Sequence, residues 1–212
     1  MKLRRARPVE PPKPRRTSSA RRDEAELRLL SAAAELIATQ GVDGLTLADL
    51  AEAAGYSRGL AAHYFGNKNG LLEATAAYAA AHFATRLGAE TRSPPGLEAL
   101  LEVIEAYLTI GPEMRKQALV LQAIIAESLT QPALRHAVAE LEARSLGRLA
   151  DMISAGQRKG EIRSDVDPRR HAVFLLGALR SLVAIWLIDT DDDAFATVRH
   201  ATVASVRRAL QA

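Results

Sequence analysis

Apolar residues recur at intervals of three and four along most of this chain, a spacing that predicts amphipathic α-helices. Just before Gly55 the apolar stripe is short and regular and comprises Leu47, Leu50, Ala51 and Ala54. Thr46 and Asp49 form a capping box at its start, and Gly55 supplies the left-handed residue that ends a helix. We therefore predict a short helix that begins at about Leu47 and turns at Gly55.

A second short helix is predicted directly after that turn. Ser57 is a suitable N-cap, and small residues at positions 59, 61 and 62 allow this helix to approach another surface closely. Arg58, His63 and Tyr64 carry the polar ends. Two short helices joined by a glycine-bearing turn form a helix-turn-helix, whose second helix enters the major groove of DNA. A purely structural helical hairpin uses the same residue types, so the spacing alone leaves both interpretations open.

Longer helices are predicted on both sides of this unit. Upstream, an apolar stripe from Leu30 to Ile37 is closed by Gly41; downstream, Asn67 caps a helix from about Lys68 to Leu87. Proline and glycine delimit five further helices. They run over Leu97–Leu108, about Glu113–Leu129, Pro132 to near Gly156, Pro168–Ile188 and about Asp192–Leu210. The sequence predicts an all-α protein in which a compact three-helix bundle precedes a larger helical part.

The segment Pro168–Ile188 is apolar nearly all round, with one stripe through Leu175 and Leu179 and another through Leu176 and Val183. A helix that is apolar on two sides is buried on two sides, so we expect a second subunit to cover the outer one. The last helix could complete a four-helix interface. The residues assigned to this homodimer interface are Phe174, Leu175, Leu179, Leu182, Trp186, Phe195, Val198, Thr202 and Val206.

The run from Ala32 to Ala74, AAAELIATQGVDGLTLADLAEAAGYSRGLAAHYFGNKNGLLEA, resembles the DNA-binding domain of TetR-family transcriptional regulators. Three features occur in the family's order: a first helix that ends at a glycine, the turn T-x-x-x-[IL]-A-x-x-A-G, and the closing x-[HY]-[YF]-F-x-x-K. Together they cover about a fifth of the chain.

The resemblance implies a role for individual residues. It places Ser57, Arg58, Gly59, Leu60 and His63 in the DNA groove, and it places Thr46, Tyr64 and Lys68 against phosphates. Leu60 stands where many relatives have a threonine, so its contact would be an apolar one with a thymine methyl. Ala62 stands where family members often have a tyrosine that touches the DNA backbone, so that contact is not carried over. Phe65 is assigned to the core.

The resemblance also implies a helical ligand-binding and dimerisation domain over residues 68–212, joined by its first helix to the DNA-binding domain, residues 23–67. The segment Gly156–Pro168 resembles a linker that is frequent in that second domain. An unidentified small effector, hydrophobic or amphipathic, is expected there. The candidate ligand-binding residues are Tyr78, His82, Tyr107, Gln122 and Glu127, although such side chains on apolar faces are commonly core or boundary residues.

Charge adds a second nucleic-acid signal. Residues 1–22 hold nine Lys or Arg against one Glu, whereas residues 23–212 hold 19 Lys or Arg against 24 Asp or Glu. Four prolines between positions 8 and 14 prevent a helix, so we expect an extended, disordered basic arm over residues 1–22. Such a run can be a solvated tail, but before a helix-turn-helix it becomes a candidate phosphate clamp or minor-groove arm. Its residues nearest the fold are Arg15, Arg16, Arg21 and Arg22.

Composition narrows the remaining possibilities. With no cysteine, disulfides, cysteine-ligated zinc and thiol catalysis are excluded, and a reducing cytoplasm is the expected compartment. The acidic run Asp189–Asp193 lacks the glycine and terminal glutamate of a calcium loop, and no histidine pair has zinc-binding spacing, so no metal or cofactor is predicted. Residues 1–22 lack the apolar core of a signal peptide, and Arg180 interrupts the apolar run Val173–Ile188, which we judge too short for a membrane span.

The leading hypothesis is a dimeric, ligand-responsive transcription factor that binds a palindromic, double-stranded DNA operator, most simply as a repressor. An enzyme is disfavoured, because the sequence holds no phosphate-binding glycine loop, nucleophile elbow or ligand-spaced cluster. A helical adaptor whose basic arm binds nucleic acid without reading its sequence is the alternative.

Overall fold

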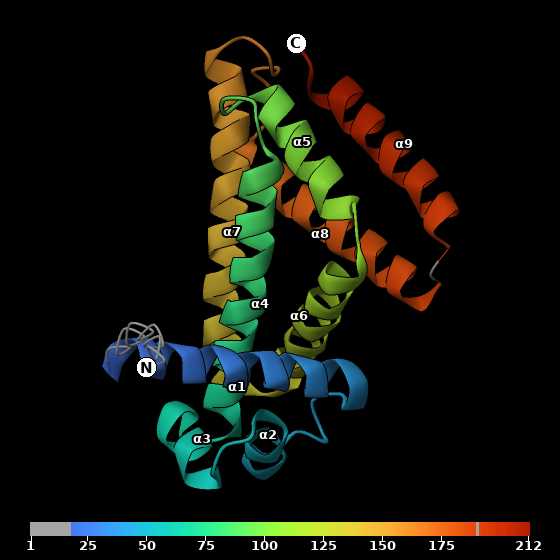
Figure 1. Cartoon of the computed structure of the whole chain (residues 1–212). Coiled ribbons are helices and arrows are strands. Elements are labelled where there is room, and N and C mark those ends of the chain that lie inside the picture. The colour runs from blue at the N-terminus through green and yellow to red at the C-terminus, as the bar shows by residue number, and fades with distance from the viewer. Residues whose placement is uncertain (1–17, 190) are drawn as a thin grey trace, which may run out of the picture.

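The computed structural model describes residues 18–189 and 191–212, and these fold into nine α-helices (Figure 1). Their bounds are α1 Ser18–Gln40, α2 Leu47–Ala54, α3 Arg58–Phe65, α4 Lys68–Glu90, α5 Leu97–Leu108, α6 Pro112–Thr130, α7 Pro132–Arg158, α8 Pro168–Ile188 and α9 Asp192–Leu210. Within this part of the chain, β-pairing is limited to one isolated bridge between Ile162 and Gln211. The predicted all-α class is confirmed.

The first helix begins earlier than the sequence indicated. Residues 18–22 form its first turns, so the prediction of an extended arm up to residue 22 is wrong for these five positions. The cause is local: the last proline of the arm is Pro14, and beyond it Ala20, Arg21 and Arg22 are good helix formers. Residues 1–17, including Arg15 and Arg16, lie outside the described residues.

The turn between α2 and α3 is built by the caps that the sequence predicted. The Thr46 side chain accepts a hydrogen bond from the Asp49 amide at 3.1 Å and donates one to the Asp49 carboxylate at 2.6 Å. Gly55 adopts φ 72° and ψ 32°, and the Tyr56 amide bonds back to the Ala51 carbonyl at 2.8 Å, which is a Schellman ending. Ser57 then caps α3 by accepting from the Leu60 amide. The path of the chain into α3 is therefore fixed by hydrogen bonds.

Two hydrophobic cores divide the molecule, and α4 passes through both. The lower core holds α1, α2, α3 and the first half of α4, whereas the upper core holds the end of α4 with α5, α8 and α9 (Figure 1). The two long partners α6 and α7 contribute to both cores. In particular Val120, Ile124, Leu134 and Val138, from the α6–α7 hairpin, are buried in the lower core.

The α6–α7 hairpin thereby joins α1, α2 and α3 to the rest of the chain. Helix α6 packs on α1 as well as on α4, and Lys116 of α6 pairs with Glu35 of α1 at 3.5 Å. An exposed ion pair contributes little to stability, so buried apolar contacts are what hold α6 against α1. A displacement of α6 must consequently be felt by α1.

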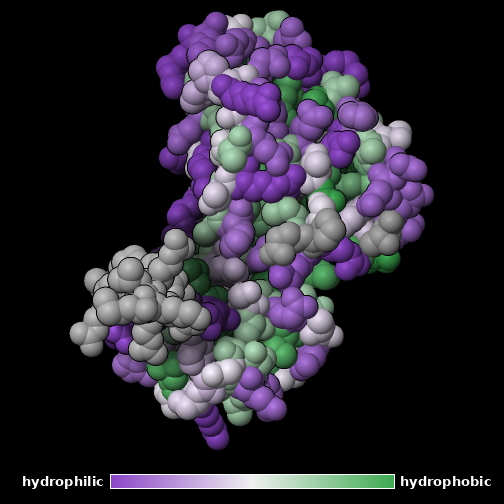
Figure 2. Space-filling model, viewed as in Figure 1, coloured by the Kyte–Doolittle hydropathy of each residue, from purple (hydrophilic) through white to green (hydrophobic). Residues whose placement is uncertain are grey.

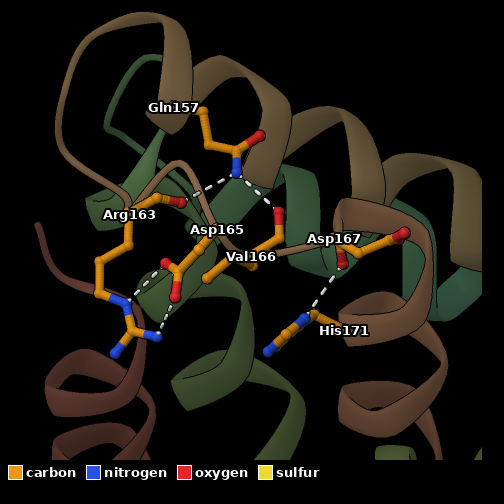
Figure 3. A network of polar contacts seen from close by, with 6 residues as sticks. All are labelled: Gln157, Arg163, Asp165, Val166, Asp167 and His171. Atoms are coloured by element: carbon orange, nitrogen blue, oxygen red, sulfur yellow. Dashed lines mark hydrogen bonds and ion pairs between the residues drawn. The ribbon is translucent and has the colours of Figure 1, made fainter.

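The segment between α7 and α8, which the sequence analysis described as a linker, is held by polar contacts (Figure 3). The Gln157 amide donates to the carbonyls of Arg163 and Val166 at 2.9 and 2.7 Å. Arg163 bonds both oxygens of Asp165, which lowers the pKa of that carboxyl. Asp167 accepts from the Arg170 amide and so caps α8, and this bond lowers its pKa. These bonds fix the direction in which α8 leaves the loop.

Helix α8 buries a broad face inside its own chain. Leu175, Leu176, Leu179, Val183 and Trp186 are all buried, so the two stripes predicted to be separate form one continuous face against α5 and α7. The apolar residues that reach the surface lie on a third stripe: Val173, Phe174, Ile185 and Ile188. The helix also reaches the length and apolar composition of a membrane span, with a mean hydropathy of 1.9, which corrects our view of the run as too short. Core packing accounts for that composition over the buried face.

Candidate nucleic-acid interface and effector cavity

Helix α3 presents one small and basic face to solvent. Ala61 and Phe65 are buried in the lower core, where α3 packs on α2 and α4, with Phe65 8% exposed, whereas Arg58, Gly59, Ala62 and His63 are exposed to solvent. Leu60 is half-buried at the edge of that face. A Cβ built at Gly59 would meet only the Ser57 hydroxyl, at 4.0 Å, so no other described residue stands over this position. Between the two basic side chains the helix can therefore approach another molecule closely.

The C-terminal end of α3 is locked to α4. Asn67 caps α4 by accepting from the Gly70 amide at 3.1 Å, and a Cβ at Gly70 would lie 2.2 Å from the Phe65 carbonyl oxygen. Only glycine allows this close approach. A rotation of α4 is thus transmitted directly to α3.

The N-terminal end of α1 is tied to the same helix. The Tyr64 hydroxyl donates to the Arg22 carbonyl at 2.9 Å, and the Arg22 guanidinium lies 3.5 Å from the His63 ring nitrogen. Arg21 and Arg22 are exposed there. The structure thus brings two basic residues of the predicted arm beside the C-terminal half of α3.

The three residues implied as phosphate contacts lie on α3 and at the starts of α2 and α4. Thr46 is exposed at the start of α2 and Tyr64 is half-buried on α3. Lys68, at the start of α4, donates to the Asp43 carbonyl at 3.0 Å and, since an ammonium has three donors, keeps others available. One of these polar groups is therefore carried by α3 and the other two by its neighbours α2 and α4.

A cavity of about 360 Å³ lies at the junction of the two cores. Its walls take Ala76, Ile124 and Val138 from the lower core and Phe83, Val103, Leu149, Leu176 and Leu179 from the upper one. This size is within the range of small-molecule sites in proteins. A molecule in this cavity would touch both halves of the chain.

Few polar groups line the cavity. The charged ones are Glu142 and Arg148 of α7 and Arg180 of α8, and Glu142 pairs with the Arg180 guanidinium. Tyr107 of α5 lies among them, and burial raises the pKa of its phenol although the neighbouring Arg180 opposes that rise. A phenol with a raised pKa stays protonated at neutral pH and can donate a hydrogen bond.

Of the five ligand-binding candidates from the sequence, only Tyr107 lines this cavity. Tyr78 packs on the lower core with its ring 4.6 Å from that of His82, which is exposed. Gln122 donates to the main-chain carbonyl of Arg180 at 3.0 Å, and Glu127 contacts Gln131 in the next turn of the chain. The sequence analysis missed Glu142, Arg148 and Arg180. Arg180 carried a signal, since it is a charge inside an apolar run.

A second hollow lies between α8 and α9. It is an apolar groove of about 510 Å³ with Phe174, Leu182, Val198 and Thr202 among its walls and Ile104 of α5 in its lining. Of the nine residues assigned to a dimer interface, Leu175, Leu179, Trp186, Phe195 and Val206 are buried within the chain's own core. Phe174 is 69% exposed and Val198 39% exposed. Hydrophobic side chains also reach the surface at the α8–α9 end of the molecule (Figure 2).

The acidic run before α9 has a structural role. Asp191 caps α9 by accepting from the Ala194 amide at 2.9 Å, and Asp192 accepts a 3.0 Å bond from the Trp186 indole. Among the described residues, no group of three or more potential metal ligands occurs. These carboxylates thus end α8 and begin α9.

A small, basic, outward-facing second helix on a capped turn defines a helix-turn-helix DNA-binding regulator. Comparison with known proteins identifies the family. Residues 29–75 match the family described as bacterial regulatory proteins, tetR family, and residues 94–202 match the tetracyclin repressor-like C-terminal domain. The chain belongs to the TetR family of transcriptional regulators.

Individual relatives agree with this assignment. The chain is 31% identical over 168 residues to the HTH-type transcriptional regulator BetI of Ectopseudomonas mendocina, which covers 76% of this chain and 79% of that protein. It is 33% identical over 120 residues to BetI of Paraburkholderia phymatum, covering 54% of this chain and only 59% of that relative. TetR-family regulators bind DNA operators and act as dimers.

Solved structures share the fold over nearly the whole chain. A TetR-family transcriptional regulator from Rhodococcus sp. superposes with a TM-score of 0.81 at 27% identity, covering 89% of this chain and all of that one. A transcriptional regulator from Saccharomonospora viridis in complex with choline gives 0.77 at 22% identity, covering 90% and 99%. The second likeness supports the fold alone.

Proposed function

We propose that this chain is a ligand-responsive repressor that binds a palindromic operator as a homodimer in the bacterial cytoplasm. One observation carries the proposal: the cavity draws its walls from both hydrophobic cores, and α4, which crosses them, is fused to the DNA-facing helix at Gly70. An effector bound in that cavity acts on α3 through a single rigid helix.

The DNA-binding half of the proposal rests on α3. Arg58 and His63 flank the low surface at Gly59 and Ala62, so the helix can lie in the major groove with both side chains at base edges. Ser57 and Leu60 lie at the entry to that face. Thr46, Tyr64 and Lys68 are assigned to phosphates, and Arg21 and Arg22 extend the basic surface along the DNA backbone. Arg15 and Arg16 stay a prediction from the sequence.

The dimer is proposed through the α8–α9 face. Phe174, Ile185 and Ile188 expose large apolar side chains on one side of α8, and the groove beside them is lined by Leu182, Val198 and Thr202. Around a twofold axis the same residues of a second copy meet this surface. Apolar side chains of one subunit can fill the groove of the other, which removes both from water.

Effector binding is proposed to act by selecting one spacing of the two α3 helices. Lower-core residues line the cavity beside upper-core ones, so a ligand favours the arrangement of α4, α6 and α7 that best encloses it. Moving a population from 1:99 to 99:1 requires roughly a 10⁴-fold preference for one arrangement. The dimer that binds DNA and the dimer that binds ligand are then different populations.

Selection of duplexes from a random pool tests the proposal. The expected site is a palindrome whose half-sites are about 34–36 Å apart, or another spacing that puts both on one face of the DNA. Binding to it should be at least about 10³-fold tighter than to random duplex. Equal affinity for both would support instead the adaptor without sequence readout, and failure to bind any duplex would contradict a DNA-binding role.

The basic arm is expected to neutralise additional phosphates. Removing residues 1–17, which leaves α1 whole, should flatten the plot of log affinity against log salt by roughly 0.9 for each phosphate that the arm neutralises. Replacing Lys13, Arg15 and Arg16 by glutamine in the full chain is the matched variant, because it removes charge without shortening the arm. An unchanged slope in a salt titration of operator binding would show that the arm does not touch DNA.

A further inference from the structure

The charged groups that line the cavity indicate which class of effector it binds. Two guanidinium groups, Arg148 and Arg180, face one carboxylate, Glu142, so the lining has a formal charge of +1. Arg180 and Glu142 are both largely shielded, with side-chain exposures of 23% and 27%, whereas Arg148 is exposed at the rim. A charge that loses solvent needs a partner of opposite sign. With one cationic group more than it has carboxylates, the lining attracts an anion in preference to a cation.

Arg180 is the group placed to receive that anion. Gln122 of α6 bonds its main-chain carbonyl, and Glu142 of α7 pairs with one nitrogen of its guanidinium. A guanidinium carries five N–H donors in a planar fork that matches a carboxylate, so donors remain beyond those that Glu142 and the Tyr107 oxygen take. The internal pair shows that a carboxylate fits against Arg180 inside this cavity. The protonated Tyr107 phenol lies beside it as a further donor.

The remaining polar groups offer little to a ligand. The Ser145 hydroxyl donates to the Leu141 carbonyl at 3.1 Å, and the Thr91 hydroxyl donates to the Leu87 carbonyl in the same way. Apart from these and the charged residues, the walls are mainly alanine and larger apolar side chains. The rest of the ligand must therefore be apolar.

The same walls offer few favourable contacts to a cationic ligand. A quaternary ammonium is held by the faces of several aromatic rings. The aromatic residues of the lining are Phe83 and Tyr107, whose rings stack at 5.5 Å and 27° and so cover one face of each other. The nearby carboxylate is occupied by Arg180, and the excess charge has the same sign as the ligand.

We propose that the cavity binds an elongated apolar molecule with a single carboxylate head group, and that Arg180 receives the carboxylate. This inference rests on the proposed role of the cavity as the effector site. A volume of about 360 Å³ holds roughly a dozen groups of the size of a water molecule, which occupies ~30 Å³. A saturated carboxylate of ten carbons is of that size. Its carboxylate would bind the remaining donors of the Arg180 guanidinium beside Glu142, which couples binding to the contact between α7 and α8.

Calorimetric titration of the full chain with three probes of equal tail length tests the head group. Decanoate, below its micellar concentration, should bind about ten- to a hundred-fold more tightly than 1-decanol, since a hydrogen bond to a charged group exceeds a neutral one by that factor. Decyltrimethylammonium should bind no better than the alcohol. The variant Ala84→Phe, which fills the cavity from α4, should abolish binding of all three.

Two variants test the assignment of Arg180. Glu142→Gln removes the competing carboxylate. It should raise the affinity for decanoate severalfold without changing the affinity for decanol. The double variant Glu142→Gln with Arg180→Gln leaves neither residue of the ion pair charged. It should lower the affinity for decanoate to that for decanol. Equal binding of decanoate and decanol by the natural chain would overturn the carboxylate inference and leave the cavity as an apolar effector site. Tighter binding of the ammonium probe would also overturn it, and failure of all three probes to bind would contradict the cavity's proposed role as well.

Discussion

Replacing Arg58 and His63 together by alanine should abolish sequence-selective DNA binding. These side chains are the charged and imidazole groups on the exposed face of α3. A well-formed pairing with a base edge discriminates by about 1–3 kcal/mol, and a dimer makes each pairing twice. Removing both side chains from both subunits thus takes away roughly 4–12 kcal/mol, the whole of a typical preference for operator over random DNA. The measurement is the ratio of the two affinities by gel shift at fixed salt.

The matched control is Arg28→Ala with His136→Ala. Both residues are exposed, each is paired to a glutamate one turn away on its own helix, and neither lies on α3. This control should keep its operator preference, while the α3 variant should keep its weak, salt-dependent binding to any duplex because its phosphate-binding groups remain. Operator preference that survives the α3 double substitution would show that DNA is read elsewhere on the molecule.

Replacing Phe174 by glutamate should convert the dimer into monomers. The side chain is 69% exposed on α8, beside the groove between α8 and α9. Burying a phenylalanine contributes about 1.5–3 kcal/mol, and a twofold interface contains it twice, so the dissociation constant of the dimer should rise by about 10²- to 10⁴-fold. Sedimentation velocity measures that constant directly. Operator affinity should fall with it, since a monomer contacts one half-site.

Leu129→Glu is the control for that change. Leu129 is 73% exposed at the end of α6, away from α8 and α9, so it tests the same removal of an exposed apolar side chain elsewhere. Its dimer should persist. If the Phe174 variant sediments as a dimer, the subunits associate through another surface.

The sequence predicted the helices well wherever proline, glycine or a capping residue marks an end. The bounds of α5 and α8 agree with the predicted ones, because Gly96 precedes the former, Gly111 and Pro112 follow it, and Pro168 opens the latter. The start of α1 was missed because residues 19–28 are mostly exposed and carry no apolar period. Such a helical extension is stabilised by propensity and by its contact with Tyr64, which leave no hydrophobic pattern.

The two parts of the candidate site differ in how far they could be foreseen. The exposed face of α3 follows from local sequence. Arg58 and Ala62 are four residues apart, as are Gly59 and His63, and the buried Ala61 and Phe65 have the same spacing. The cavity depends on which side of α4 meets α6 and α7. Tyr78 and His82 lie on α4 but outside the lining, which instead uses the stripe through Ala76, Ala80 and Phe83. Spacing within one helix cannot decide between two such faces.

The burial of Ile124, Leu134 and Val138 in the lower core, which also holds α1, has a consequence for combining parts of different regulators. A chimera cut after residue 67 would join its new N-terminal segment to a hairpin selected for another partner, and the mismatch would fall on fully buried atoms. Exchanging residues 18–79 together with the α6–α7 hairpin keeps those atoms with their own neighbours. The transferable module of this protein is therefore discontinuous in sequence.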